Sequence, residues 1–213
     1  EFLLKRLKEE NISLDYISKV KGNSGISVAI SNKNGDYSAV VISGVNLQIP
    51  KDTLYENNLW KNCSFLMIQN EITEEMNILA AKEAKKRNIK VFFNSAPAKK
   101  INYELFKYVD ILLTNEIEAK QLCQDYSNNY DIIIKKLSKK VSKVIITLGY
   151  KGVLYCEKNK IPIHIKGHEV KVKSAHGAGD YFAGKFISNF IETNDFEDSI
   201  KTANKKTSEF ISS

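Results

Sequence analysis

From residue 64 onward, short apolar runs alternate with segments of helical periodicity, and this alternation constrains the fold more than any other feature of the chain. The runs at 65–68, 91–93, 111–113 and 144–146 are apolar throughout. Continuous apolar runs are typical of strands that helices cover on both faces. We therefore predict one α/β domain over residues 1–213, with a doubly wound, mostly parallel sheet and flanking helices.

The same periodicity predicts the individual elements. Strands are expected at 64–68, 89–93, 110–113 and 143–148. They should be parallel neighbours in one sheet, because each pair is joined by a helical crossover. Helices are expected at 73–87, 102–107, 115–124 and 130–140. The remaining elements are short antiparallel strands within 152–156 and 160–172, a helix from about Gly179 and a last helix over 195–211.

The N-terminal part has a different pattern, with helical spacing over residues 1–12 and then alternating strands at 25–31 and 38–43. The polar turn at 32–35 between these strands predicts a β-hairpin. Alternation along its first strand places Ile26, Val28 and Ile30 on one face. Such an apolar face needs a cover.

The charge and hydrophobicity of the chain limit the classes of partner that it can bind. The chain has 32 Lys and Arg against 25 Asp and Glu, a formal charge of +7, which suits nucleic acid or a phosphorylated small molecule. The lysines are scattered and lack the interleaved aromatic side chains of a base-stacking platform, so we do not expect nucleic-acid binding. No apolar run approaches the roughly 18 residues of a membrane span, so we expect no membrane partner either.

The three cysteines are far apart and have no metal-ligand spacing. Cys63, Cys123 and Cys156 suggest neither a disulfide framework nor a thiolate zinc site. The sequence is therefore consistent with a reducing, cytoplasmic location.

The segment Gly177-Ala178-Gly179-Asp180 carries the clearest chemical signal. Small residues at the start of a predicted helix leave backbone N–H groups free, and the helix dipole favours an anion there. Asp180 is then either a helix-capping carboxylate or a general base beside a bound phosphoryl group. We predict a phosphate seat at this helix start.

Three further segments follow predicted strands, where an open α/β sheet collects its ligands. They are residues 93–98, with the sequence Phe-Asn-Ser-Ala-Pro-Ala, the pair Asn115 and Glu118, and residues 147–152, with the sequence Thr-Leu-Gly-Tyr-Lys-Gly. Together with residues 176–184 they resemble the ribokinase-like (PfkB) family of carbohydrate kinases. The hairpin, at about 25–46, resembles the lid of that family.

The resemblance implies a role for each matching residue. Asp180 would be the catalytic base, and Gly177, Ala178 and Gly179 would form the anion hole for the transferring phosphoryl group. Asn115 and Glu118 would lie by the ATP phosphates, with Glu118 helping to hold hydrated Mg²⁺. The remaining implied ligand contacts are a nucleotide cleft lined by Thr147, Gly149 and Gly152, Asn204 near the adenine, and Glu71 accepting a hydrogen bond from a substrate hydroxyl.

Simpler interpretations of the same residues stay open. Glu118 would be an exposed residue of a first helical turn and Asn115 its cap, while Gly149 and Gly152 would be turn residues. Glu71 would be a solvated charge before a helix. For Asn204, a position near the adenine and a position without a functional role are both possible.

The leading functional hypothesis is an ATP-dependent kinase that phosphorylates an alcohol group of a small sugar or sugar-like molecule. The alternative is a non-catalytic ribokinase-like protein that binds nucleotide or sugar. The family normally opens with a strand bearing a substrate-binding Asp and a Gly-Gly segment, and neither precedes the hairpin here, so we expect the chain to lack that segment. The resemblance does not identify which sugar is phosphorylated. It implies that the substrate, and often a second subunit, covers the lid, so we expect a homodimer through the hairpin.

Overall fold

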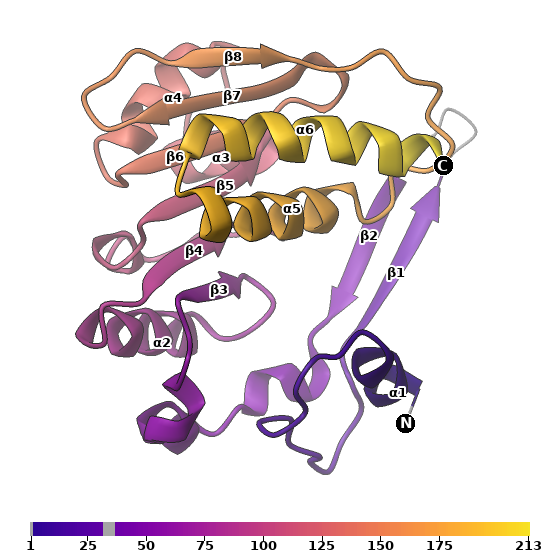
Figure 1. The fold of residues 1–213 in the computed structure, drawn as a ribbon, viewed down its shortest axis with the longest axis vertical. Helices are drawn as coiled ribbons and strands as arrows, with labels where there is room; N and C mark the ends of the chain where they lie inside the picture. The colour runs from indigo at the N-terminus through magenta and orange to yellow at the C-terminus, as the bar shows by residue number, and fades with distance from the viewer. Residues whose placement is uncertain (1, 32–36) are drawn as a thin grey trace.

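A six-stranded sheet organises most of the chain in the computed structural model, which describes residues 2–31 and 37–213 (Figure 1). Its strands follow one another in the order β3-β4-β5-β6-β7-β8. Their bounds are β3 Phe65–Gln69, β4 Lys90–Asn94, β5 Ile111–Asn115, β6 Lys143–Thr147, β7 Gly152–Glu157 and β8 Ile163–Lys166. The first four strands are parallel and the last two antiparallel, so the predicted sheet is confirmed.

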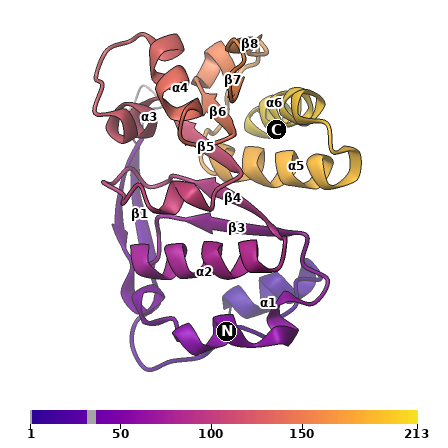
Figure 2. The ribbon, with the colours of Figure 1, turned by 90° about the vertical axis from the view of Figure 1, so that its left-hand side faces the viewer.

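Helices cover the sheet on both faces (Figure 2). One group consists of α2 Glu74–Lys86, α3 Glu116–Cys123 and α4 Tyr130–Ser138, and the other of α5 Ala178–Thr193 and α6 Phe196–Ser212. Successive side chains of a strand point to opposite faces. Accordingly, Val91 and Phe93 of β4 pack in the same cluster as α2, α3 and α4, whereas Phe92 packs with α5 and α6. The doubly wound architecture is thereby confirmed.

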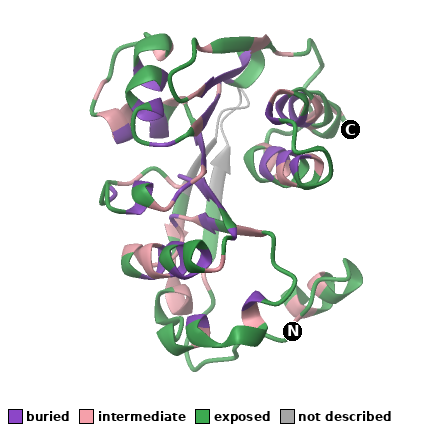
Figure 3. Ribbon diagram, turned by 60° about the vertical axis from the view of Figure 1, so that its left-hand side comes forward, coloured by how far each residue is buried: buried purple, intermediate pink, exposed green. Residues whose placement is uncertain are grey.

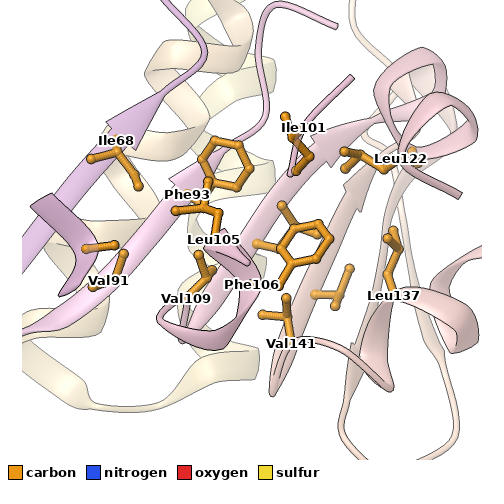
Figure 4. Packing of buried hydrophobic residues seen from close by; sticks show 14 of the residues in the cluster. Ile68, Val91, Phe93, Ile101, Leu105, Phe106, Val109, Leu122, Leu137 and Val141 are labelled. Carbon is orange, nitrogen blue, oxygen red and sulfur yellow. The ribbon is translucent and has the colours of Figure 1, made fainter. Parts of the chain in front are cut away.

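Each face has its own apolar core, and buried residues gather along the sheet and the helix sides that face it (Figure 3). On the first face, Phe93 belongs to the same apolar cluster as Leu122 and Leu137 of the helical layer (Figure 4). On the second, the ring of Phe186 stacks on that of Phe92, with centroids 5.6 Å apart. This packing fixes α5, and with it the helix start at Ala178, against the sheet.

The hairpin is separate from the main sheet (Figure 1). Strands β1 Ile26–Ser31 and β2 Tyr37–Ile42 pair antiparallel, with Ile26 opposite Ile42 and Val28 opposite Val40. These four apolar side chains are 50–59% exposed. The predicted hairpin is confirmed, while its turn at 32–35 and the side chain of Ile30 lie outside the described part.

Four segments differ from the prediction. Helix α1, Phe2–Glu9, is shorter than 1–12 because Asn11 has a left-handed φ of 56°. Only Leu105–Lys107 of 102–107 is helical, as a short 3₁₀ turn. Strand β8 ends at Lys166 because its partner β7 begins at Gly152, the residue opposite. Three 3₁₀ helices within 44–60 were not anticipated.

No helix in the described ranges has both the length and the apolar character that crossing a membrane requires.

Candidate active site

The start of α5 has open space beside its two glycines, although the backbone N–H of Ala178 donates to the carbonyl of Ala175 at 3.2 Å. Gly177 is the N-cap residue and has a left-handed φ of +77°. A Cβ built on Gly177 or on Gly179 would meet no described atom within 4 Å. Because helix N-termini attract anions and nothing described fills this space, the start of α5 can seat a phosphoryl group.

Asp180 lies in the first turn of α5 and is exposed. Its Oδ1 accepts a 3.1 Å hydrogen bond from Nε2 of Gln69, at the end of β3. The two residues are 111 positions apart, so no local pattern indicated this contact. The structure therefore joins the predicted base to the strand at the edge of the sheet.

Asn115 and Glu118 form a reciprocal cap at the start of α3. Asn115 Oδ1 accepts from the backbone N–H of Glu118, and Glu118 Oε2 accepts from the backbone N–H of Asn115, both at 2.9 Å. Asn115 Nδ2 donates to Glu118 Oε1, also at 2.9 Å. The capping interpretation of Asn115 is therefore correct.

The alternative in which Glu118 is a solvent-exposed residue is wrong, because its side chain is only 5% exposed. The hydroxyl of Ser95, in the loop after β4, donates to Glu118 Oε2 at 3.2 Å. Burial raises the pKa of Glu118, and the hydrogen bonds from Asn115 and Ser95 oppose that rise in part. A buried carboxylate held by both of its oxygens is thus built into this edge of the sheet.

A cavity of about 510 Å³ opens at the start of α5, and Asn115, Glu118, Gly177 and Asp180 are not among its lining residues. The predicted site residues that line it are Thr147, Gly149, Gly152, Ala178, Gly179 and Asn204. Asn204 is buried, and its Nδ2 donates to the backbone carbonyl of Lys166 at 2.9 Å. The structure thus brings these six residues to one cavity.

The apolar walls of the cavity were not anticipated from the sequence. They include Val170, Val172, Phe182 and Ile211. Val170 and Val172 alternate in a segment that pairs with no described strand, and that alternation is the only local signal they give. Apolar walls with a few polar groups are typical of sites for small organic ligands.

Gly149 and Gly152 also serve the turn between β6 and β7, as the simpler interpretation holds. Their φ angles are +58° and +99°. A Cβ on Gly152 would lie 2.1 Å from the backbone oxygen of Ile165. Gly152 is therefore required by the close approach of β8 as well as lining the cavity.

Glu71 is half-buried in the loop after β3 and does not line the cavity. Two neighbours fix this loop. Asn70 Nδ2 donates to the carbonyl of Ser95 at 2.7 Å, and Lys99 Nζ donates to the carbonyl of Asn70 at 2.5 Å. Burial lowers the pKa of Lys99, and the charge of Glu71 acts in the opposite direction.

The donor set around Glu118 suits a hydrated cation better than a fully protein-ligated one. No cluster of three or more His, Cys, Asp or Glu residues that could hold a metal ion occurs among the described residues. The bonds from Asn115 and Ser95 occupy three of the about four acceptor positions of a carboxylate, and Thr114 also hydrogen-bonds Glu118. Mg²⁺ keeps several waters when phosphate oxygens complete its shell, so a role of Glu118 toward the ion would be through water.

Comparison with known proteins identifies the family of the chain. The profile of the pfkB family carbohydrate kinases matches residues 1–212. The chain belongs to this family. It is 34% identical to the ribokinase of Dictyostelium discoideum over 229 residues, which cover 96% of this chain and 72% of that protein. It is 32% identical to the ribokinase of Lactococcus lactis over 206 residues, 95% of this chain and 66% of that protein.

The structure of Arabidopsis thaliana ribokinase complexed with ribose and ATP is similar as well. Its TM-score is 0.81 at 25% identity, covering 94% of this chain and 67% of that one. The chain thus spans about two thirds of the length of these relatives. The expected class, a carbohydrate kinase that transfers a phosphoryl group from ATP to an alcohol group, is confirmed, and nothing in the comparisons favours the non-catalytic alternative.

Proposed function

We propose that this protein phosphorylates a hydroxyl group of a pentose such as ribose, with ATP as donor and Asp180 as the general base. The observation that carries the proposal is the exposed carboxylate of Asp180 in the first turn of α5, beside the open glycines of the helix start. The ribokinases to which the chain is 32–34% identical support a pentose as the first substrate to test.

In the proposed reaction, Asp180 accepts the proton of the attacking hydroxyl as that oxygen bonds to the γ-phosphorus. The backbone N–H groups of Gly177, Ala178 and Gly179 face the transferring phosphoryl group in this proposal, which requires Ala178 to give up its 3.2 Å hydrogen bond to the carbonyl of Ala175. They stabilise the negative charge on its oxygens in the transition state, as donors fixed in advance do without reorganisation.

The nucleotide occupies the cavity in this proposal. Its volume of about 510 Å³ lies in the usual range of small-molecule sites. Thr147, Gly149 and Gly152 border the nucleotide, and Asn204 lies by the adenine. Support comes from the continuity of this cavity with Gly179 at the start of α5, which lets one bound molecule reach from the apolar walls to the anion seat.

Mg²⁺ would be held at the side of α3. Glu118 would bind a water of the hydrated ion, and Asn115, whose side chain holds the carboxylate in place, would lie by the same phosphates. When bound, the ion neutralises charge on the ATP phosphates.

On the sugar side, Glu71 accepts a hydrogen bond from a substrate hydroxyl. The loop that carries Glu71 is suited to this because Asn70 and Lys99 fix its backbone. The hairpin acts as a lid over the sugar.

A second copy of the chain covers the apolar face of the hairpin, so the protein is a homodimer. Support comes from the cross-strand pairs formed by Ile26, Val28, Val40 and Ile42, which leave an exposed apolar face on both strands. We also place the protein in the reducing cytoplasm, in keeping with its free cysteines at 63, 123 and 156.

Asp180→Asn tests the central proposal. The change keeps size and polarity but removes the proton acceptor, so kcat with ribose should fall by about 10²–10⁴-fold. ATP binding, measured by calorimetry, should stay within about twofold, because the phosphate seat is made of backbone groups. Near-normal turnover of the Asn variant on every accepted sugar would falsify the mechanism.

A further inference from the structure

We propose that Gln69 is a positioning residue for the general base, an inference that rests on the proposed role of Asp180. Gln69 is half-buried at the end of β3, and its Nε2 donates a 3.1 Å hydrogen bond to Oδ1 of Asp180. This is a contact between the edge strand of the sheet and the first turn of the helix that carries the phosphate seat.

The contact distinguishes the two oxygens of Asp180. An exposed aspartate rotates freely about its side-chain bonds, and only some orientations place an oxygen where a substrate hydroxyl can reach it. With Oδ1 held by the amide of Gln69, the carboxylate has one defined orientation, and Oδ2 is the oxygen that accepts the proton. Holding a reacting group in productive geometry is worth a large part of the rate, and a misplacement of about 1 Å can cost about 10²-fold.

Gln69 can act as an anchor because its own backbone is fixed. It pairs with Asn94 in the parallel ladder between β3 and β4. Its carbonyl accepts a 2.7 Å hydrogen bond from Nδ2 of Asn77, a residue of α2 that is 1% exposed. The amide that holds Asp180 is therefore mounted on a strand and a helix, as precise sites require.

The next residue ties this anchor to the other side of the site. The backbone N–H of Asn70 donates to the carbonyl of Ala96 at 2.8 Å, and Asn70 Nδ2 donates to that of Ser95 at 2.7 Å. The hydroxyl of Ser95 then donates to Glu118 at 3.2 Å. Hydrogen-bonded neighbours thus run from Asp180 to Glu118, so the base and the carboxylate beside the ATP phosphates share one frame.

The test compares two variants of Gln69 with Gln121→Leu, a matched change at a half-buried glutamine of α3. Gln69→Leu has a similar volume, but its side chain is one atom shorter and has no donor. It should lower kcat for ribose by about 10- to 100-fold, with KM for ATP and the melting temperature unchanged. Gln121→Leu should keep kcat within twofold.

Gln69→Glu adds a second measurement, the pH dependence of kcat/KM, which should not change if the role of Gln69 is only structural. It replaces the donor by a second carboxylate beside Asp180, and like charges this close oppose ionisation. The acidic limb of its kcat/KM profile should therefore shift to higher pH, while that of Gln121→Leu stays in place.

The proposal is overturned if Gln69→Leu keeps kcat within twofold, if it raises KM for ATP without changing kcat, or if Gln69→Glu leaves the acidic limb unmoved. Should Gln69→Leu fail to fold, the isosteric Glu variant decides alone. The outcome is separable from the proposed function: if Asp180→Asn is inactive and both Gln69 variants are normal, only the positioning role fails. If Asp180→Asn is active, the general base itself is wrong.

Discussion

The hydroxyl of Ser95 donates to Oε2 of Glu118 across 3.2 Å, and both side chains are buried, at 1% and 5% exposed. Ser95 follows β4, and Glu118 lies on the helix that follows β5. Since β4 and β5 are parallel neighbours, their following segments meet at one edge of the sheet. A buried carboxylate at such an edge is suited to binding rather than to solubility.

Glu118→Gln should change how stability depends on pH. Because burial raises the pKa of Glu118, the folded chain holds this proton more tightly than the unfolded chain. The stabilisation is fully present below the ordinary glutamate pKa of about 4.3 and is lost as pH rises through the folded pKa. The free energy of unfolding of the wild type, relative to Glu118→Gln, should therefore fall as pH rises from acid to neutral.

Urea unfolding of both proteins at a series of pH values measures this difference. A difference that does not vary with pH, or that rises with it, would contradict the prediction.

Gly179→Ala should separate folding from function. The φ of Gly179 is not left-handed, and no described atom lies within 4 Å of a Cβ built there, so the helix should gain about 0.5–1 kcal/mol of stability. The methyl group nevertheless enters the phosphate seat, and kcat/KM for ATP should fall by about tenfold or more. The larger Gly179→Val should lower it further.

Gly184→Ala is the matched control, since Gly184 is exposed on the same helix and equally open. It should raise stability and leave kcat/KM unchanged. Full activity of the Gly179→Val variant would contradict the prediction that Gly179 forms part of the phosphate seat.

Val40→Asp tests the dimer. Val40 is 59% exposed and lies opposite Val28 in the hairpin, so a charge there would be desolvated by a second copy. Sedimentation velocity should show the dimer dissociation constant raised by about tenfold or more. The control is Val20→Asp, at a valine that is 41% exposed and lies outside the hairpin; this variant should still dimerise. A wild-type protein that is strictly monomeric at high concentration would contradict the proposed interface.

Phe186→Ala should destabilise the α5 face of the core. Its ring is fully buried and lies between those of Phe92 and Phe190, with centroids 5.6 Å and 5.5 Å away. Loss of such a side chain costs about 3–5 kcal/mol in the free energy of unfolding, measured by chemical denaturation. Phe210→Ala, where the ring is 38% exposed, should cost clearly less. Equal losses in the two variants would contradict the buried packing of α5.

Some features of this protein follow from the sequence alone, because they are written within a few neighbouring residues. The four apolar runs predicted the parallel strands β3 to β6, since a strand covered on both faces must be apolar throughout. The alternation around Ile26 predicted the hairpin, and Gly177 to Asp180 predicted a helix start. Each of these is a local property of periodicity or backbone conformation.

Other features were decided only by the tertiary structure. The spacing of Asn115 and Glu118 predicted a cap, yet the burial of Glu118 depends on Ser95 from another loop. The contact of Gln69 with Asp180 joins residues 111 positions apart, and the cavity walls at Val170 and Ile211 come from separate segments. Such contacts depend on the order of the strands in the sheet and on which loops meet at its carboxyl edge, and periodicity, which repeats over a few residues, carries no record of that order.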